Sequence, residues 1–343
     1  MDNSVYKKSG VNIDANNESN ERIKPHVRST FTKDVLADVG LFGGIMSIEW
    51  VKEMKHPALV LSMDGVGTKT KIARMLNKYD TIGVDIVHHS INDILVQGGK
   101  GLFFLDYVAS DNLRPKIVEE IVKGMAIACK KAGIVLIGGE TAEMPSVYLK
   151  DEHDVVGCIG GIVEKDDIIK GQDIVAGDIL YGLRSSGLHT SGYSLARYVL
   201  FDTNKISVNK VLDGMDMPIG EALLVPHREY ASLLLPILKK VKIKGMAHIT
   251  GGGFIDNIPR ILPKGCGAKI DKKSWQVPVL FKHIVSLGKV SEGEAYKTLN
   301  MGIGMVLALD KKEGKKFEEE CKKAGETVYK IGEVIRGNGV QIS

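Results

Sequence analysis

Apolar residues recur along the chain with two spacings, and the spacing changes from one segment to the next. Short apolar runs bounded by glycine or polar residues predict strands at 57–63, 102–109, 133–137, 155–163, 178–183, 246–249 and 328–335. Apolar residues three and four positions apart predict helices at 84–95, 114–131, 219–240 and 311–323, with a further helix beginning near Tyr193. Residues 1–30 are polar with little periodicity, and we expect an arm with some local order.

Strands and helices alternate in this pattern, which is typical of an α/β protein. The charged segment Glu164–Asp173 separates two halves with the same alternation. We therefore predict two α/β domains, residues 1–168 and residues 169–343, which agrees with a length of 343 residues.

The composition is that of an ordinary soluble globular protein, with 44% hydrophobic and 26% charged residues. A net charge of +4, spread along the chain, gives no reason to expect nucleic-acid or membrane binding. The four cysteines are far apart and form no CxxC pair, which disfavours zinc and a disulfide framework and favours a reducing compartment. The polar N-terminus resembles no signal peptide, and we expect a cytoplasmic protein.

Acidic residues stand beside glycine at the expected ends of three elements. These pairs are Asp64-Gly65, Asp93 before Gly98-Gly99, and Glu140 after Gly138-Gly139; Asp106 lies within a strand-like run. Carboxylate oxygens suit Mg²⁺, which commonly bridges a protein to nucleotide phosphates. The alternative is that these acids only cap helices and turns, but their recurrence favours a site.

Two loops of the second half are candidates for binding phosphate. Ser186, Gly187 and His189 precede an expected helix start, where backbone N–H groups favour anions. Gly251, Gly252 and Gly253, followed by Asn257, would allow a ligand to approach the backbone closely. Capping or flexible turns are the alternatives for these two loops.

Several common motifs are absent. Lys69 follows Gly67-Thr68, so no Walker A sequence is present, and Lys69 either approaches a phosphate or lies on the surface. No GxGxxG, GxSxG or HExxH sequence occurs. His88 and His89 could bind a metal with Asp85 and Asp93, but a solvated helix face is the favoured interpretation.

Longer strings in order along the chain are far more specific than any of these short motifs. They are YKKSGVNIDANN, SMDGVGTKTKIA, TIGVDIVHHSINDILVQGG, LFFLDYVA, IGGETAEMP, SSGLHTSGYSLAR and HITGGGFIDNIPR. Together they resemble the phosphoribosylformylglycinamidine cyclo-ligases, also called aminoimidazole ribonucleotide synthetases, from about Tyr6 to Ile335.

The resemblance implies an enzyme of purine synthesis that uses ATP and Mg²⁺ to close the imidazole ring of formylglycinamidine ribonucleotide, with release of ADP and phosphate. It implies an N-terminal domain that binds ATP and magnesium and whose sheet pairs with that of a second subunit in a homodimer. It also implies a C-terminal domain with a larger, helix-covered sheet that binds the substrate and its phosphate. The expected roles are metal binding for Asp64, Asp93 and Glu140 and catalysis for Asp93, His189 and Lys24. ATP binding is expected at Asp64, Gly65, Lys69, Asp93, Asp106, Gly138, Gly139 and Glu140, and substrate binding at Ser186, Gly187, His189, Gly251, Gly252, Gly253 and Asn257.

The chain departs from the family pattern at a few positions. Glycines replace alanine and proline in Gly98–Gly101, which leads us to expect a more flexible loop after Asp93. Ser191 replaces asparagine, and His227 stands where threonine is expected. Related families with the same architecture would need a cysteine near either end or lack GGETAEMP, and the first cysteine here is Cys129.

Overall fold

The computed structural model describes residues 9–343, which form two compact units. The first unit comprises the chain up to Ser90 together with Gly101–Lys165, and the second comprises Ile91–Lys100 together with Asp166–Ser343. The sequence-based division placed Ile91–Lys100 in the first domain, because no composition change marks that segment. None of the described helices is long and apolar enough to span a bilayer.

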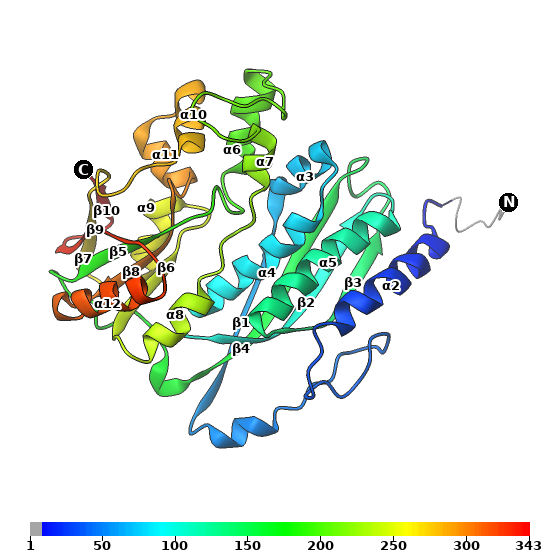
Figure 1. Cartoon of the computed structure of the whole chain (residues 1–343), viewed down its shortest axis with the longest axis horizontal. Helices are drawn as coiled ribbons and strands as arrows, with labels where there is room; N and C mark the ends of the chain where they lie inside the picture. The colour runs from blue at the N-terminus through cyan, green and yellow to red at the C-terminus, as the bar shows by residue number, and fades with distance from the viewer. Residues whose placement is uncertain (1–8) are drawn as a thin grey trace. The chain divides into compact units, whose positions relative to one another are not determined.

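The first unit contains a four-stranded mixed sheet in the order β1-β4-β2-β3 (Figure 1). The strands are β1 (Pro57–Gly65), β2 (Lys100–Ser110), β3 (Val135–Glu143) and β4 (His153–Glu164). β1 runs antiparallel to β4, and β2 runs parallel to β3. Its helices are α2 (Ile13–Arg28), α3 (Thr70–Leu76), α5 (Pro115–Ala132) and all but the last turn of α4 (Asp80–Leu95), with 3-10 turns at Glu49–Glu53 and Gly67–Lys69.

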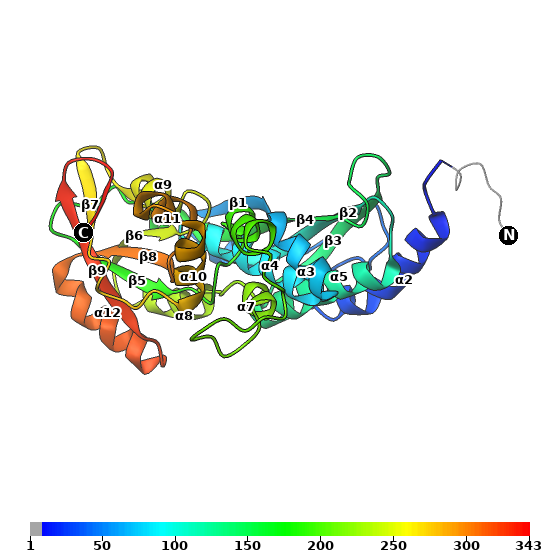
Figure 2. The same ribbon diagram turned by 90° about the horizontal axis from the view of Figure 1, so that it is seen from above.

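Helices α3, α4 and α5 lie on the same side of this sheet (Figure 2). Two glycines let α4 and α5 approach closely. A Cβ atom on Gly83 would lie 2.0 Å from the Ile121 carbonyl oxygen, and one on Gly124 would lie 1.9 Å from that of Asp80. The edge strand β1 buries Val60 but leaves Leu59, Leu61 and Met63 62–72% exposed, so its other face is apolar and open in the single chain.

The second unit contains a six-stranded sheet in the order β10-β7-β9-β5-β8-β6. The strands are β5 (Ile179–Arg184), β6 (Ile243–His248), β7 (Cys266–Ile270), β8 (Ile303–Leu309), β9 (Val328–Arg336) and β10 (Val340–Ile342). All neighbours are antiparallel except β10 and β7. Every residue of β8 is buried, so this strand lies in the core of the unit.

The second unit's helices are short apart from two. They are α6 (Tyr193–Arg197), α7 (Ile219–Leu224), α8 (Ala231–Leu238), α9 (Gly253–Asn257), α10 (Val279–Gly288), α11 (Glu292–Thr298) and α12 (Lys311–Lys323), with a π-helical turn at Tyr198–Thr203 and 3-10 turns at Lys165–Asp167 and Ile258–Ile261.

The structure corrects several expected elements. The polar arm is a helix from Ile13 to Arg28, and the side chain of Asn12 caps its first turn by accepting from the Ala15 N–H (3.3 Å). The single helix predicted at 219–240 is two helices, because Val225 before Pro226 leaves the helical conformation (φ −50°, ψ 126°) and ends α7. Strand β3 was expected to end at Gly138, but it continues through Gly139 and Glu140 to Glu143. Sequence pattern also missed α3, α9, α10, α11, β7 and β10.

Candidate active site

Two of the expected acids lie one register position apart on neighbouring strands of the first unit. Asp106 on β2 pairs in register with Gly139 on β3, next to Glu140. A Cβ atom on Gly139 would lie 2.1 Å from Asp106 Oδ1, so glycine is required for the carboxyl group to lie across β3. Burial, and to a lesser degree the Glu140 charge, raises the pKa of Asp106 to about 7. Carboxylate oxygens are ligands that Mg²⁺ prefers, so each acid by itself is of a type that could hold the ion, but one register position apart their side chains point to opposite faces of the sheet.

Asp64 lies at the end of edge strand β1, as predicted, and β4 separates β1 from β2. One Asp64 oxygen accepts the Gly65 N–H (2.6 Å), and the other lies 2.9 Å from Nε2 of His89 on α4. The Asp64 side chain is 49% exposed, whereas His89 is buried. The expectation that the polar face of α4 is solvated was therefore wrong, because Asp85, His89 and Asn92 are all buried.

The two candidate lysines of the first unit differ in environment. Lys69 is fully buried and its Nζ lies 2.8 Å from Asp85, so the surface alternative for this residue is excluded. Burial lowers the pKa of Lys69, and the Asp85 carboxylate opposes that shift. Lys24 lies on α2, is partly exposed and pairs with Glu21. Lys69 therefore joins α4 to the segment after β1, while Lys24 retains access to solvent.

In the second unit, Asp93 accepts a hydrogen bond from His248, which is in turn bonded to His227. The sequence did not predict that these residues lie together. Asp93 Oδ1 lies 2.8 Å from His248 Nδ1, and His248 Nε2 lies 3.0 Å from His227 Nε2. The His227 ring stacks on that of His189, with centroids 3.9 Å apart and planes at 21°. His189, His227 and His248 are each at least 94% buried. Because they are far apart in sequence, spacing gave no signal for His227 or His248.

The neighbouring residue Asn92 fixes the segment that carries His227. Its side-chain N–H donates to the Arg228 carbonyl (2.8 Å), and its side-chain oxygen accepts from the Tyr230 N–H (3.0 Å). The break between α7 and α8 is thus held to the last turn of α4. After that turn, Gly98 has a φ of +83° and its N–H donates to Leu95 (2.7 Å). Gly98 thus caps the C-terminus of α4, and the flexibility expected for Gly98–Gly101 stays a prediction.

The loop from Ser186 to His189, which is predicted to bind phosphate, is fixed by hydrogen bonds to several other segments of the second unit. Ser186 N–H donates to His189 Nε2 (3.1 Å), and Ser186 Oγ–H donates to the Pro226 carbonyl (2.6 Å). The Gly187 carbonyl accepts from Asn300 Nδ2 (2.9 Å). His189 has a left-handed backbone with φ of +64° and is almost wholly buried. Ser186 itself is exposed, so its position remains compatible with ligand contact.

The first and last glycines of the loop Gly251–Gly253 have different surroundings. A Cβ atom on Gly253 would lie 2.1 Å from the Tyr296 carbonyl oxygen, so that position needs glycine for packing. A Cβ atom on Gly251 would meet nothing within 4 Å, which leaves its backbone open. The Asn257 amide donates to the carbonyls of Gly251 (3.1 Å) and Gly253 (2.8 Å), so this side chain holds the loop's shape.

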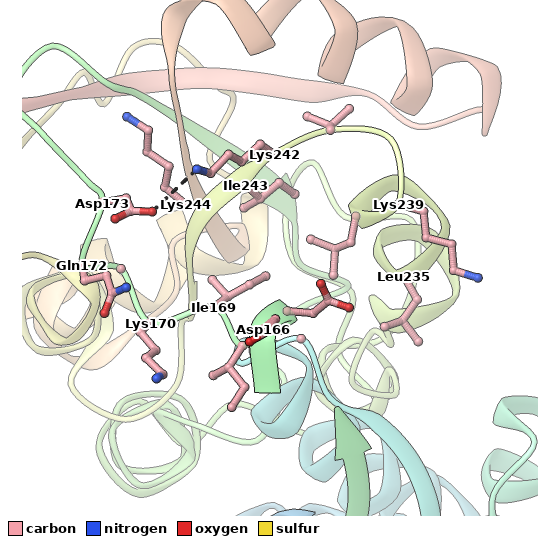
Figure 3. Close-up of a pocket in the computed structure, with 16 residues that line it drawn as sticks. Asp166, Ile169, Lys170, Gln172, Asp173, Leu235, Lys239, Lys242, Ile243 and Lys244 are labelled. Atoms are coloured by element: carbon pink, nitrogen blue, oxygen red, sulfur yellow. Dashed lines mark ion pairs between the residues drawn. The ribbon is translucent and has the colours of Figure 1, made fainter. Parts of the chain in front are cut away.

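A cavity of about 580 Å³ lies elsewhere in the second unit (Figure 3). Its apolar wall includes Ile169 and Leu235, and lysines and aspartates line its edge, among them Lys242 and Asp173 with Nζ and Oδ2 3.6 Å apart. None of the residues expected from the sequence to bind ATP, substrate or metal lines it.

Two known domain types together match most of the chain, and their boundary differs from that of the two units only at Ile91–Lys100. Residues 48–163 match the family described as AIR synthase related protein, N-terminal domain, and residues 175–343 match its C-terminal domain. The fold is similar to that of a thiamine-monophosphate kinase from Stenotrophomonas maltophilia, with TM-score 0.68, 14% identity, and coverage of 94% of this chain and 95% of that one. A hydrogenase maturation protein HypE, solved in complex with ATP, has TM-score 0.63 and 15% identity over 91% and 84% of the two chains. At these identities the likeness shows the fold alone. The two family matches define a two-domain AIR synthase related protein.

A much higher sequence identity shows the particular family. The phosphoribosylformylglycinamidine cyclo-ligase of Alkaliphilus metalliredigens is 47% identical over 334 residues, which cover 97% of this chain and 96% of that protein. The chain belongs to the phosphoribosylformylglycinamidine cyclo-ligase family.

Proposed function

We propose that this protein closes the imidazole ring of formylglycinamidine ribonucleotide in de novo purine synthesis, consuming ATP and producing aminoimidazole ribonucleotide, ADP and phosphate. The observation that carries this proposal is 47% identity to a cyclo-ligase over almost the full length of both chains. The expected acids Asp64, Asp93, Asp106 and Glu140 are all present, and each lies in a well-formed element of the fold.

The chemistry begins with a formyl amide carbon that is a poor electrophile. Transfer of a phosphoryl group to the amide oxygen activates this carbon, an amidine nitrogen of the same molecule attacks it, and phosphate leaves. Holding the substrate folded brings the two reacting groups together, and such proximity can contribute on the order of 7–11 kcal/mol at best.

The carboxylates of Asp64, Asp93 and Glu140 would hold Mg²⁺, which neutralises charge on the transferred phosphoryl group. Asp106 and the glycines of β3 would complete the ATP site, with Gly65 next to Asp64 and Lys69 from its buried position against Asp85. In the second unit, the open backbone of Gly251 and the exposed Ser186 would bind the substrate phosphate. Lys24 and His189 stay proposed catalytic groups, and because His189 Nε2 accepts the Ser186 N–H, its Nδ1 would be the atom that carries a proton.

We further propose a homodimer formed through the first unit. Leu59, Leu61 and Met63 alternate along an edge strand and present an apolar row to solvent in the single chain. An exposed apolar face of this kind is normally covered in a stable protein. The same sheet of a second copy of the chain would cover it. The proposed compartment is the cytoplasm.

The test is ATP hydrolysis measured with and without formylglycinamidine ribonucleotide and Mg²⁺. ADP release should require both, and aminoimidazole ribonucleotide should form in equal amount. ATP hydrolysis at the same rate without the ribonucleotide would contradict the proposed reaction.

A further inference from the structure

His227 occupies a central place in the second unit's histidine cluster, because its ring contacts the proposed catalytic residue His189 and also His248, which is bonded to Asp93. Its Nε2 lies 3.0 Å from His248 Nε2, its Nδ1 lies 3.4 Å from Thr190 Oγ1, and its face stacks on His189. His227 is 1% exposed and lies in the extended break between α7 and α8.

The Asp93 carboxylate at one end of this cluster determines which ring nitrogens are hydrogen-bond donors. A carboxylate can only accept, so His248 Nδ1 carries a proton and donates to Asp93 Oδ1. In a neutral His248 ring, Nε2 is then an acceptor, and His227 Nε2 must be the donor to it. His227 Nδ1 consequently accepts from the Thr190 hydroxyl. Each ring therefore has one defined tautomer, and His227 fixes the ring orientation of His248 from the side opposite Asp93.

The ring face of His227 supports the loop that contains His189. His189 receives the Ser186 N–H at Nε2, and Ser186 Oγ–H donates to the carbonyl of Pro226, the residue before His227. The segment 226–227 thus holds this loop through a hydrogen bond, a ring stack and the contact with Thr190. Rings stacked 3.9 Å apart contribute through dispersion and area burial, which do not depend on the ring nitrogens.

A transition-metal site is the other interpretation of three buried histidines whose ligand atoms lie within 4.8 Å of one another. The observed arrangement disfavours it. The lone pair of His189 Nε2 is used by the Ser186 N–H, so a neutral His189 has its proton on Nδ1. The lone pairs of imidazole lie in the ring plane, and the nearly parallel planes of His189 and His227 do not converge on one ion.

We propose that His227 is a positioning residue for ring closure with two separable effects. Its Nε2–H orients His248 against Asp93, which affects the chemical step, and its ring face orders the His189 loop, which affects substrate binding. This inference rests on the proposed function, in which Asp93 and the His189 loop serve the same reaction.

Two variants separate the effect on His248 from the effect on the His189 loop. His227→Phe keeps a ring that can stack on His189 but has no N–H group to donate. His227→Gln has no ring, but its side-chain amide nitrogen is the same number of bonds from Cα as His227 Nε2 and can donate in its place. The Phe variant should lower kcat about tenfold, as expected for the loss of one hydrogen bond, with KM for the ribonucleotide within about twofold of wild type. The Gln variant should recover kcat to within about threefold and raise KM several-fold. A wild-type kcat in the Phe variant, or equal losses in both variants, would overturn the proposal.

A measurement on the wild-type protein decides the hydrogen-bond part without any variant or substrate. Spectra of ¹⁵N-histidine-labelled protein should show His248 protonated on Nδ1 and His227 protonated on Nε2. The opposite tautomer at either ring would refute the assigned donors, and a shift of all three histidines on addition of Zn²⁺ at an equimolar concentration would favour the metal site instead. Since these spectra need no turnover, a failure of the proposed reaction would be seen separately, in the ATP assay.

Discussion

Replacing Gly304 by alanine should disturb two buried aromatic side chains at once, Tyr230 and the proposed catalytic residue His189. Gly304 lies on the fully buried strand β8, and a Cβ atom there would be 2.2 Å from the Tyr230 hydroxyl and 2.4 Å from His189 Cε1. Ordinary contacts between such atoms are about 3.5–4.0 Å, so both rings must move by more than about 1 Å. Tyr230 would lose its hydrogen bond to the Arg184 carbonyl (2.7 Å).

The expected cost is the sum of two effects. Forcing one extra carbon into a packed core typically costs about 1–3 kcal/mol, and an intramolecular hydrogen bond contributes about 1 kcal/mol. A destabilisation of about 2–4 kcal/mol lowers the melting temperature of a unit of this size by on the order of 10 °C. Displacement of His189 should also lower kcat/KM for the ribonucleotide in samples that are still folded.

Thermal unfolding and the coupled ATP assay test this prediction, with Gly293→Ala as the matched control. Gly293 lies on helix α11, and a Cβ atom there would meet nothing within 4 Å. Alanine in a helix is favoured over glycine by roughly 0.5–1 kcal/mol, so the control should be unchanged or slightly more stable. If Gly304→Ala were as stable and as active as Gly293→Ala, the packing around His189 would not be as described.

Three further predictions follow from the same contacts. Asp93→Asn should keep the melting temperature within a few degrees, since asparagine can still accept from His248, but should abolish substrate-dependent ADP release; wild-type turnover would remove Asp93 from the site. Leu61→Glu should convert the proposed dimer to monomers in sedimentation experiments while Ile127→Glu, on exposed α5 surface, should not; equal masses for both variants would contradict the interface. Burial lowers the pKa of His153 to about 4 and favours its neutral form, so stability should be lost as pH falls from about 6.5 to about 4, by about 3 kcal/mol at most. In His153→Phe this acid-induced loss should be smaller, and an unchanged pH profile of urea unfolding would refute the assignment.

Sequence pattern located the elements whose periodicity is strong. The helix with Val84, Val87 and Ile91 on one face is α4, and the strand ending at Asp64-Gly65 is β1. The same local reasoning failed at Gly138 and Gly139. Glycine pairs usually end strands, but here glycine allows the Asp106 side chain to lie across β3, and that requirement depends on the neighbouring strand.

The partners of the candidate site residues could not be predicted from the sequence, because they lie far away along the chain. Lys69 is buried because Asp85, on a helix that follows it, neutralises its charge, and no pattern around Lys69 reveals that partner. His248 lies 155 positions from Asp93, its hydrogen-bond partner. Asp64, Asp93 and Glu140 could be selected from the sequence as candidates, because each stands beside a glycine or near the expected end of an element. Their partners could not, because the partners are determined by the packing of the sheet.

The last turn of α4 has a consequence for how the chain can be divided. Although α4 begins in the first unit, its segment from Ile91 belongs with the second, and Asn92 there is fully buried. A fragment ending at Lys165 would contain Asn92 without Arg228 and Tyr230, leaving a buried amide group without its hydrogen-bond partners. The complementary fragment, beginning at Asp166, would lack Asp93 and leave His248 without its carboxylate. The two halves of the gene are therefore not interchangeable modules, and chimaeras with relatives should exchange residues 91–100 together with the C-terminal half.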